Sequence, residues 1–312
     1  MKFVLRKFFT LLITLFIVSI LAFFAFQIIP GDPAAARLGL QATPESLEAL
    51  RREMGLDRPV TERYFDWMYQ FLLGDMGQSY IQDMSVRELL GDRLIITGTI
   101  MGLSFFLTIG IALPVGLLTG KKQQGAAHGI TTVVSQVVMA VPPLFLGLIL
   151  TFVFGAILRV FTPTDFISFR ESISGYLLYL FFPALAIALP KSAMTVRLIR
   201  ASIRDEMGKE YVRTAKSRGN GENALLYRHM LPNIAVPVVT FLILTLTMIV
   251  TDSIVVEQVF SVPGAGRLLV SAIGNRDYPV VQALVMLISA LIMGLYFLSD
   301  VICRMIDPRI TI

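Results

Sequence analysis

Long apolar runs alternate along the chain with shorter polar segments. Six of these runs carry few or no charges, and each is long enough to cross a bilayer, which takes about 20 apolar residues in a helix. They are residues 8–29, 94–118, 130–158, about 175–199, about 234–256 and about 280–302. A helix satisfies its backbone hydrogen bonds within its own segment, as hydrocarbon requires. The pattern therefore predicts an all-α integral membrane protein with six transmembrane helices.

Two of the six runs need further argument. The first follows Lys2, Arg6 and Lys7, as the apolar part of a secretory signal would. It is longer than the 7 to 15 apolar residues of such a signal, so we interpret it as an uncleaved span. The fourth run has the weakest pattern, because Lys191 and Arg197 interrupt it.

Composition supports a membrane protein. Hydrophobic residues make up 55% of the 312 residues and charged residues only 16%, and the mean hydropathy is +0.73. Soluble domains have about a quarter of their residues charged, so we exclude a soluble globular fold. Cys303 is the only cysteine, and the chain can therefore form no internal disulfide.

The distribution of Lys and Arg between short loops predicts the orientation, because these residues accumulate on the cytoplasmic side. With the N-terminus inside, fifteen lie in the cytoplasm and four outside. The inner set is Lys2, Arg6, Lys7, Lys121, Lys122, Arg197, Arg200, Arg204, Lys209, Arg213, Lys216, Arg218, Arg228, Arg304 and Arg309; the outer set is Arg159, Arg170, Arg267 and Arg276. Residues 30–93 are not counted, since long loops cross regardless of charge. Both termini are expected in the cytoplasm.

The predicted organisation has four parts. They are residues 1–29, the N-terminus and first span; 30–93, an extracytoplasmic segment with short helices; 94–303, a five-span core with a cytoplasmic loop at 200–232; and 304–312, a cytoplasmic tail. In the second part, Thr43 can cap a helix that begins at Pro44 and stops at Gly55. The aromatic run at 64–73 contains the only tryptophan and is expected at the membrane interface.

The cytoplasmic loop has a pattern found nowhere else in the chain. Residues 204–232 predict a helix, a glycine break, a short helix and a proline stop. Gly219 and Gly221 permit a sharp reversal. Leu225, Leu226 and His229 share one face of the short helix, and Pro232 is expected to end it. A short helix held at the membrane surface suits the docking of a partner. The alternative is a basic loop that only fixes topology.

The spacing in this loop resembles a known signature. Arg213-x-Ala215, then Gly219, then His229-x-Leu231-Pro232 after nine intervening residues is similar to the loop of binding-protein-dependent transporter permeases. The family's Glu and Ile are replaced here by Arg213 and His229. Its dipeptide, oligopeptide and nickel branch also shows the following strings, which stand here in the same order. They are Pro30-Gly31-Asp32-Pro33, Gly55-Leu56-Asp57-Arg58-Pro59, Gly74-Asp75-x-Gly77-x-Ser79, Val259-Phe260-Ser261-x-Pro263-Gly264-x-Gly266-Arg267, Arg276-Asp277-Tyr278-Pro279 and Asp307-Pro308-Arg309.

The resemblance implies a fold, partners and a mechanism. The fold would be that of a type I ABC importer permease in the bacterial cytoplasmic (inner) membrane, with the first span outside the core. The partners would be a second homologous permease, two ATPase subunits and an extracytoplasmic solute-binding protein. Arg213, Ala215 and Gly219 would position a coupling helix, and residues 221–229 would form or flank the face that docks on an ATPase. Di- or oligopeptides would be the solute, with a nickel chelate or glutathione as alternatives.

No catalytic site is expected in this chain, and ATP and Mg²⁺ would be bound by the partner ATPases. Residues 116–122 look faintly like a phosphate loop but have the wrong glycine spacing and follow a membrane span. His128 and His229 are the only histidines, and neither has ligands at metal-binding spacing. We expect no metal site and no nucleic-acid partner.

Ionisable residues in the predicted spans are costly in lipid and need water or a partner. Lys191 is expected to reach the cytoplasmic interface with its flexible side chain. For Asp252, lining the transport pathway and a structural hydrogen bond to a partner permease remain open, and Glu257 is a second pathway candidate at the outer end. An ion-driven carrier is the alternative of a different class, but no internal repeat supports it.

Overall fold

The computed structural model describes residues 2–28, 32–39, 42–121, 125–161 and 166–306. Nearly all of them are helical, as predicted, and the described part contains a single isolated β-bridge, between Gln78 and Ser85. The α-helices are α1 (Lys2–Ile28), α2 (Pro33–Leu38), α3 (Pro44–Glu53), α4 (Val60–Leu72), α5 (Val86–Lys121), α6 (Ala126–Ala140), α7 (Pro143–Leu150), α8 (Ile173–Met207), α9 (Glu210–Ser217), α10 (Glu222–Ala224), α11 (Leu231–Val259), α12 (Ala265–Asn275) and α13 (Tyr278–Ile306). Two segments are π-helical: η2 (Thr151–Ile157) and η3 (Leu225–Met230).

Five of the six predicted spans are single long helices: α1, α5, α8, α11 and α13. The third is different: the prediction of one continuous helix over residues 130–158 is wrong. The segment breaks between Ala140 and Pro143 and bends by 99°. Two consecutive prolines explain the break, since proline has no N–H to donate and its ring clashes with the preceding turn. The described chain therefore has five spans, or six if the bent pair counts as one.

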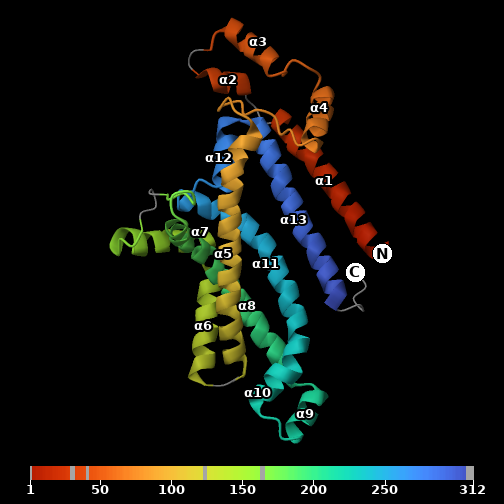
Figure 1. Cartoon of the computed structure of the whole chain (residues 1–312), viewed down its shortest axis with the longest axis vertical. Coiled ribbons are helices and arrows are strands. Elements are labelled where there is room, and N and C mark those ends of the chain that lie inside the picture. The colour runs from red at the N-terminus through yellow and green to blue at the C-terminus, as the bar shows by residue number, and fades with distance from the viewer. Residues whose placement is uncertain (1, 29–31, 40–41, 122–124, 162–165, 307–312) are drawn as a thin grey trace. The chain divides into compact units, whose positions relative to one another are not determined.

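The helices divide into two compact units. Unit 1 comprises residues 1–97 and 263–297, and unit 2 comprises residues 98–262 and 298–312. In unit 2, α8 packs against α6, α7 and α11 (Figure 1). Of the five long helices, α8 is the most buried. Two prolines within it, Pro183 and Pro190, do not end the helix.

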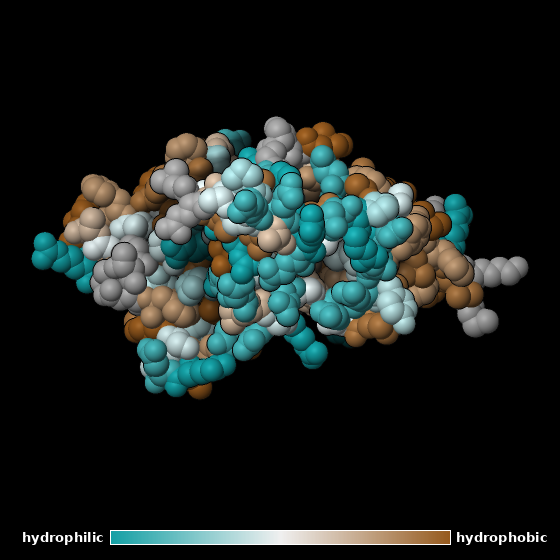
Figure 2. Space-filling view, turned by 90° about the horizontal axis from the view of Figure 1, so that it is seen from above, coloured by the Kyte–Doolittle hydropathy of each residue, from teal (hydrophilic) through white to brown (hydrophobic). Residues whose placement is uncertain are grey.

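Short capped helices, α2 and α3, follow α1 in unit 1. Thr43 accepts a hydrogen bond from the Ser46 amide and Ser46 caps in return, and Gly55 has a φ of +63°, so the predicted start and stop of α3 are confirmed. Helix α3 lies at the end of unit 1 that Figure 2 faces, where hydrophilic residues gather. The aromatic run forms α4, on which Trp67 and Tyr64 contact Phe23 of α1.

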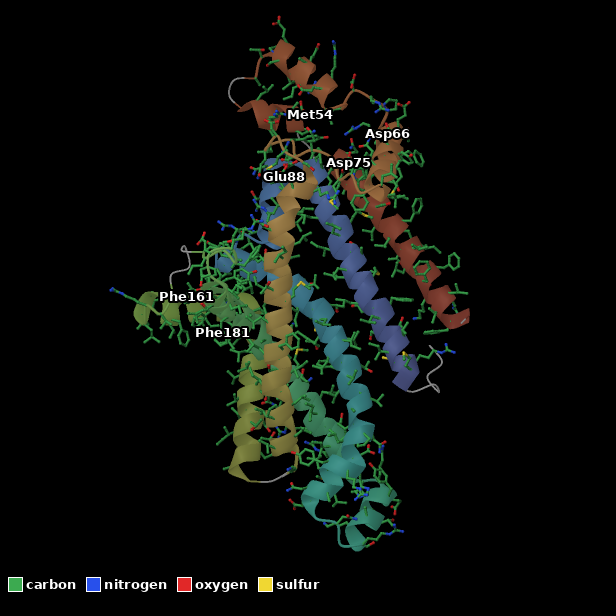
Figure 3. All side chains as sticks on the ribbon, in the orientation of Figure 1. Met54, Asp66, Asp75, Glu88, Phe161 and Phe181 are labelled. Atoms are coloured by element: carbon green, nitrogen blue, oxygen red, sulfur yellow. The ribbon has the colours of Figure 1, made fainter. Side chains whose placement is uncertain are left out.

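Two sequence motifs nearly 200 residues apart meet in unit 1. Asp277, which precedes α13, is buried and accepts hydrogen bonds from the Ser79 hydroxyl and, at 2.9 Å, from the Tyr80 amide. The Ser79 hydroxyl in turn accepts from the Gln82 amide at 2.9 Å. The loop before α5 is thereby fastened to the start of α13. Met54, Asp66, Asp75 and Glu88 mark this part of unit 1 in Figure 3.

An aromatic cluster surrounds Phe182 of α8 in unit 2. Phe161 stacks on Phe182 of α8 with ring centroids 4.6 Å apart and also contacts Phe260 at 6.0 Å. The Tyr179 hydroxyl donates to the Phe260 carbonyl at 2.9 Å. Figure 3 labels Phe161 and, beside it, Phe181 of α8. These contacts join the end of α11 to α8.

Candidate coupling site

The loop between α8 and α11 folds into a small helical unit that we call the coupling unit, residues 208–232. It consists of α9, a turn, α10 and η3. Gly219 has a φ of +83°, and residues other than glycine rarely adopt this backbone conformation. The predicted reversal at Gly219 is therefore confirmed. The Asn220 side chain donates to the Ala215 carbonyl at 2.9 Å and closes the turn onto the end of α9.

Two details of the predicted loop are wrong. Gly221 has a φ of −68° and a ψ of 160°, an extended conformation open to any residue, so the reversal depends on Gly219 alone. Pro232 does not end the second helix, because helix continues from Glu222 to Val259. The Leu231 amide bonds to the Leu226 carbonyl, five residues back. A π-helical turn widens the helix and leaves room for a proline ring that would otherwise clash with the preceding turn.

The two leucines of the short helix point inward. Leu225 and Leu226 are buried in a core with Val212, Ala215 and Met230, to which the ends of α8 and α11 also contribute. Leu225 and Leu226 therefore lie beneath the surface that residues 221–229 are expected to form or flank, and the docking role of this segment stays a prediction. Hydrophobic burial explains their position, since the loop must make its own small core to hold a fixed shape at the end of two long helices.

The outward surface of the coupling unit is polar and mostly basic. Arg213 is exposed and pairs with Glu210 at 3.0 Å on the same helix. Tyr227 is also exposed, 48% of its surface being accessible. The coupling unit also contains a cavity of about 340 Å³, lined by Tyr211, Thr214, Ala215, Arg218, Asn220 and His229. Of the predicted site residues, the structure thus brings Ala215 and His229 together at this cavity. Leu231 and Pro232 lie at the first turn of α11.

Glu206 ties the coupling unit to the two long helices. Its carboxylate is buried at the end of α8, lies 2.7 Å from the Lys209 ammonium and accepts hydrogen bonds from the Tyr211 hydroxyl and the Asn233 side chain. Burial, and then this hydrogen bond, raise the pKa of Tyr211, so its hydroxyl stays a donor. Sequence reasoning did not single out Glu206, because an acidic residue in a charged loop has no distinguishing pattern. Only the fold shows its three partners.

A second brace comes from the end of α5. The Lys121 ammonium donates to the Asn223 side chain at 2.7 Å and lies 4.8 Å from the centre of the Tyr227 ring. Cation–π contacts of this kind contribute roughly 0.5–1 kcal/mol at exposed sites. The coupling unit is therefore held by α5, α8 and α11, and a force applied to it would reach all three helices.

Two of the charges predicted within the spans pair with each other. The Lys191 ammonium on α8 lies 2.8 Å from a carboxylate oxygen of Asp252 on α11. The prediction that Lys191 reaches the cytoplasmic interface is wrong: a carboxylate within the protein is available, and a pair costs less in low dielectric than either charge alone. Glu257 is fully buried near the end of α11.

One cationic side chain, Arg200, also joins α8 to α6. The Arg200 guanidinium contacts the His128 ring at 2.7 Å and donates to the Thr132 hydroxyl at 2.9 Å. In the part of the chain that the structure describes, no group of three or more His, Cys, Asp or Glu side chains is arranged to hold a metal ion. The coupling unit is built from helix ends and from the side-chain contacts that join them.

Residues 112–312 match the family model of the binding-protein-dependent transport system inner membrane component, and residues 1–101 match the model of its N-terminal region. The chain belongs to this family. Its fold is that of a type I ABC importer permease, and it is a multi-pass inner membrane protein that works with ATPase and binding-protein partners. The resemblance seen in the sequence is thereby confirmed.

Several permeases are similar along nearly their whole length. A probable peptide ABC transporter permease of Sinorhizobium fredii is 30% identical over 308 residues, which cover 99% of this chain and 98% of the relative. The oligopeptide transport system permease AppB of Bacillus subtilis is 31% identical, over 94% of each chain. The dipeptide transport system permease DppB of Lactococcus lactis is 27% identical, over 99% of each.

Proposed function

We propose that this permease forms, with a second homologous permease, the pathway of an importer for di- or oligopeptides. Two ATPase subunits bind ATP and Mg²⁺, one of them docks on the coupling unit, and an extracytoplasmic binding protein delivers the peptide. The observation that carries the proposal is a coupling unit fastened to α5, α8 and α11 by Lys121 and Glu206. The peptide as solute is supported by the three relatives named above.

The proposed mechanism follows from these braces. The exposed surface around Arg213, Arg218 and Tyr227 enters a groove of the ATPase. When the ATPases close on ATP, the coupling unit moves with them and pulls the ends of three long helices. Packed helices have discrete arrangements, so the displacement switches the pathway from inward-open to outward-open. Asp252 and Glu257 remain pathway candidates, Asp252 as part of an ion pair and Glu257 as a buried group at the end of α11.

Transport by the assembled complex tests this proposal. We expect proteoliposomes that contain both permeases and the ATPases, with binding protein on the outer side, to accumulate radiolabelled dipeptide only with ATP inside. Omission of the ATPases should abolish uptake. Solute flux through this chain alone would contradict the proposal and favour a carrier.

The proposed orientation has both termini and the coupling unit in the cytoplasm. Cysteines placed at Gln41 and Gln123 would report the two sides of the membrane, but both residues lie outside the described part of the chain. Exposed residues that the structure describes, Glu48 and Ser217, therefore carry the labels. In a Cys303→Ser background, we expect Ser217→Cys to react with a membrane-impermeant maleimide only from the cytoplasmic side and Glu48→Cys only from the outside. The charge distribution supports this result. The opposite labelling pattern would reverse the proposed topology.

A further inference from the structure

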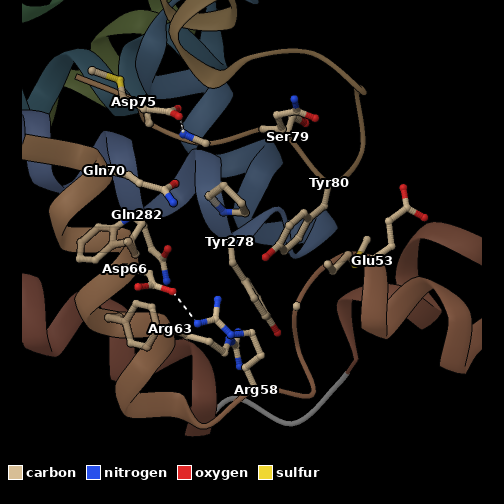
Figure 4. Close-up of a pocket in the computed structure, with 18 of the residues that line it drawn as sticks. Glu53, Arg58, Arg63, Asp66, Gln70, Asp75, Ser79, Tyr80, Tyr278 and Gln282 are labelled. Atoms are coloured by element: carbon tan, nitrogen blue, oxygen red, sulfur yellow. Dashed lines mark hydrogen bonds and ion pairs between the residues drawn. The ribbon is translucent and has the colours of Figure 1, made fainter. Parts of the chain in front are cut away.

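A cavity in unit 1 and a groove in unit 2 differ in chemistry. The cavity, shown in Figure 4, is polar, and one of its arginines, Arg58, pairs with Asp66 at 2.7 Å. The groove has a volume of about 240 Å³ and is formed by α5, α6 and α8 (Figure 1). Its lining consists of aliphatic side chains and the hydroxyls of Thr131, Ser135 and Ser192. The groove is therefore apolar and carries no charge among the described residues that line it.

The groove has an exposed rim and a buried floor. Val115, Ile130 and Val134 at the rim are exposed, whereas Ala193 and Val196 of α8 are buried. Helices α5, α6 and α8 belong to candidate membrane spans, so the rim can face the acyl chains of a bilayer. Lipid tails are as apolar as the groove, and packing against them gives little selectivity by itself.

Direct packing fixes the walls of the groove. Helix α5 approaches α8 so closely that a Cβ on Gly116 would lie 3.0 Å from the Ile199 side chain. Helix α6 is joined to α8 by the hydrogen bond from Arg200 to Thr132. A preformed groove binds a ligand without the cost of ordering its own side chains.

A buried arginine stands at one end of the groove. Arg200 follows Val196 by one turn of α8, on the side of the coupling unit, and is only 8% exposed. Within the described residues, its hydrogen bonds to His128 and Thr132 all come from Nη2. Its Nε is buried without a partner. No carboxylate in the described part of the chain pairs with this guanidinium, which therefore lacks a counter-charge.

The charges near Arg200 do not supply the missing anion. Arg204, one turn further along α8, lies close enough to repel the Arg200 charge. The buried carboxylate of Glu206 is occupied by Lys209, Tyr211 and Asn233, as described above. Asp205 is exposed, and five residues of helix place it on a different side of α8 from Arg200. A charge at the end of a membrane span needs a partner, so an anion from outside the chain is expected here.

We propose that this groove binds one anionic phospholipid from the leaflet nearest the coupling unit, with an acyl chain along Ala193 and Val196 and the phosphate on Arg200. A guanidinium can bind a phosphate through two parallel hydrogen bonds, and basic sites between membrane helices bind anionic lipid headgroups. A zwitterionic lipid would bring an ammonium group that Arg200 and Arg204 repel. The inference is independent of the proposed function, because it concerns neither the solute nor the ATPases.

Native mass spectrometry of the full-length permease in detergent tests this site. Dioleoylphosphatidylglycerol and dioleoylphosphatidylcholine, titrated separately, have the same acyl chains and differ in net charge. We expect the first phosphatidylglycerol to bind at least about fivefold more tightly than the first phosphatidylcholine, as one basic residue at a membrane surface contributes about this factor. An excess of inorganic phosphate should not displace the lipid, because phosphate has no acyl chain to occupy the groove.

Substitutions identify the residues involved. Arg200→Gln should reduce the preference for phosphatidylglycerol to about twofold or less, without weakening phosphatidylcholine binding. Arg197→Gln is the matched control: Arg197 is an exposed arginine of the same helix that does not line the groove, and its variant should keep the wild-type preference. Ala193→Leu should weaken phosphatidylglycerol binding about threefold or more, because the larger side chain fills part of the groove. This variant serves alone if Arg200→Gln is unstable in a thermal melt.

Four results with the permease would overturn the proposal: equal affinity for the two lipids, displacement by phosphate, an unchanged preference in Arg200→Gln, or the same loss in Arg197→Gln. The assembled importer distinguishes lipid from protein as the occupant. We expect each copy of this permease in the complex to retain one phosphatidylglycerol. Loss of that lipid on assembly would show that the second permease covers the groove, and would also overturn the proposal.

Discussion

Gly219→Val is expected to reduce ATP-dependent peptide uptake at least about tenfold while leaving the permease inserted in the membrane. The φ of +83° at this position is one that a β-branched residue cannot adopt without strain of roughly 1–3 kcal/mol. No atom lies within 4 Å of the position where a Cβ would stand, so the effect comes from the backbone alone. The strained turn would release Asn220 from Ala215 and alter the surface offered to the ATPase.

Gly221→Val provides the matched control for this prediction. The same side chain is added two residues away, again with no atom within 4 Å, at a φ of −68° that valine tolerates. We expect uptake within about twofold of the wild type, since no backbone strain arises. Uptake and ATPase activity in proteoliposomes measure both variants. Equal loss in both, or normal uptake in Gly219→Val, would show that the positive φ is not what coupling requires.

Asp252→Asn is expected to destabilise the permease by about 3 kcal/mol, because it leaves the buried Lys191 ammonium without its counter-charge. The side chains of this pair are only 11% and 22% exposed, so water compensates little. The measurement is the thermal midpoint of the detergent-solubilised permease, followed by the loss of monodisperse protein on heating. Peptide uptake at a temperature where the variant remains folded separates stability from transport.

The double variant Lys191→Met with Asp252→Leu tests the pairing directly. Removing both charges takes away the desolvation cost together with the attraction, and apolar replacements of buried ion pairs are often neutral in stability. We expect the double variant to be more stable than Asp252→Asn alone. If the loss of stability in the double variant equals the sum of the losses in Lys191→Met and Asp252→Leu measured separately, the two residues do not interact. The ion pair would then not explain why Asp252 lies within a span.

Local signals in the sequence were sufficient for the spans and the caps. Five long apolar runs became long helices, because hydropathy and length suffice to identify a helix in a membrane. Helix α3 begins at the residue predicted from Thr43 and Pro44, since a cap depends only on atoms within one turn. The positive φ of Gly219 was likewise a local inference.

Contacts between distant residues were not predictable from the sequence. Lys191 and Asp252 are separated by 61 positions, and nothing in either run indicates that the two charges meet. Glu206 acquires three partners only when α8, α9 and α11 come together. The break in the third run had a visible signal, two adjacent prolines, but the uniform hydropathy of the run outweighed it.

The bend between α6 and α7 has a consequence for the surroundings of that segment in the membrane. Pro142 and Pro143 carry no backbone N–H, so the helical bonds that would end on the carbonyls of Val138 and Met139 have no donors. These two carbonyls need hydrogen-bond donors from their surroundings, and hydrocarbon has none. Residues 138–143 are therefore expected to face water or polar atoms of protein, and not lipid acyl chains.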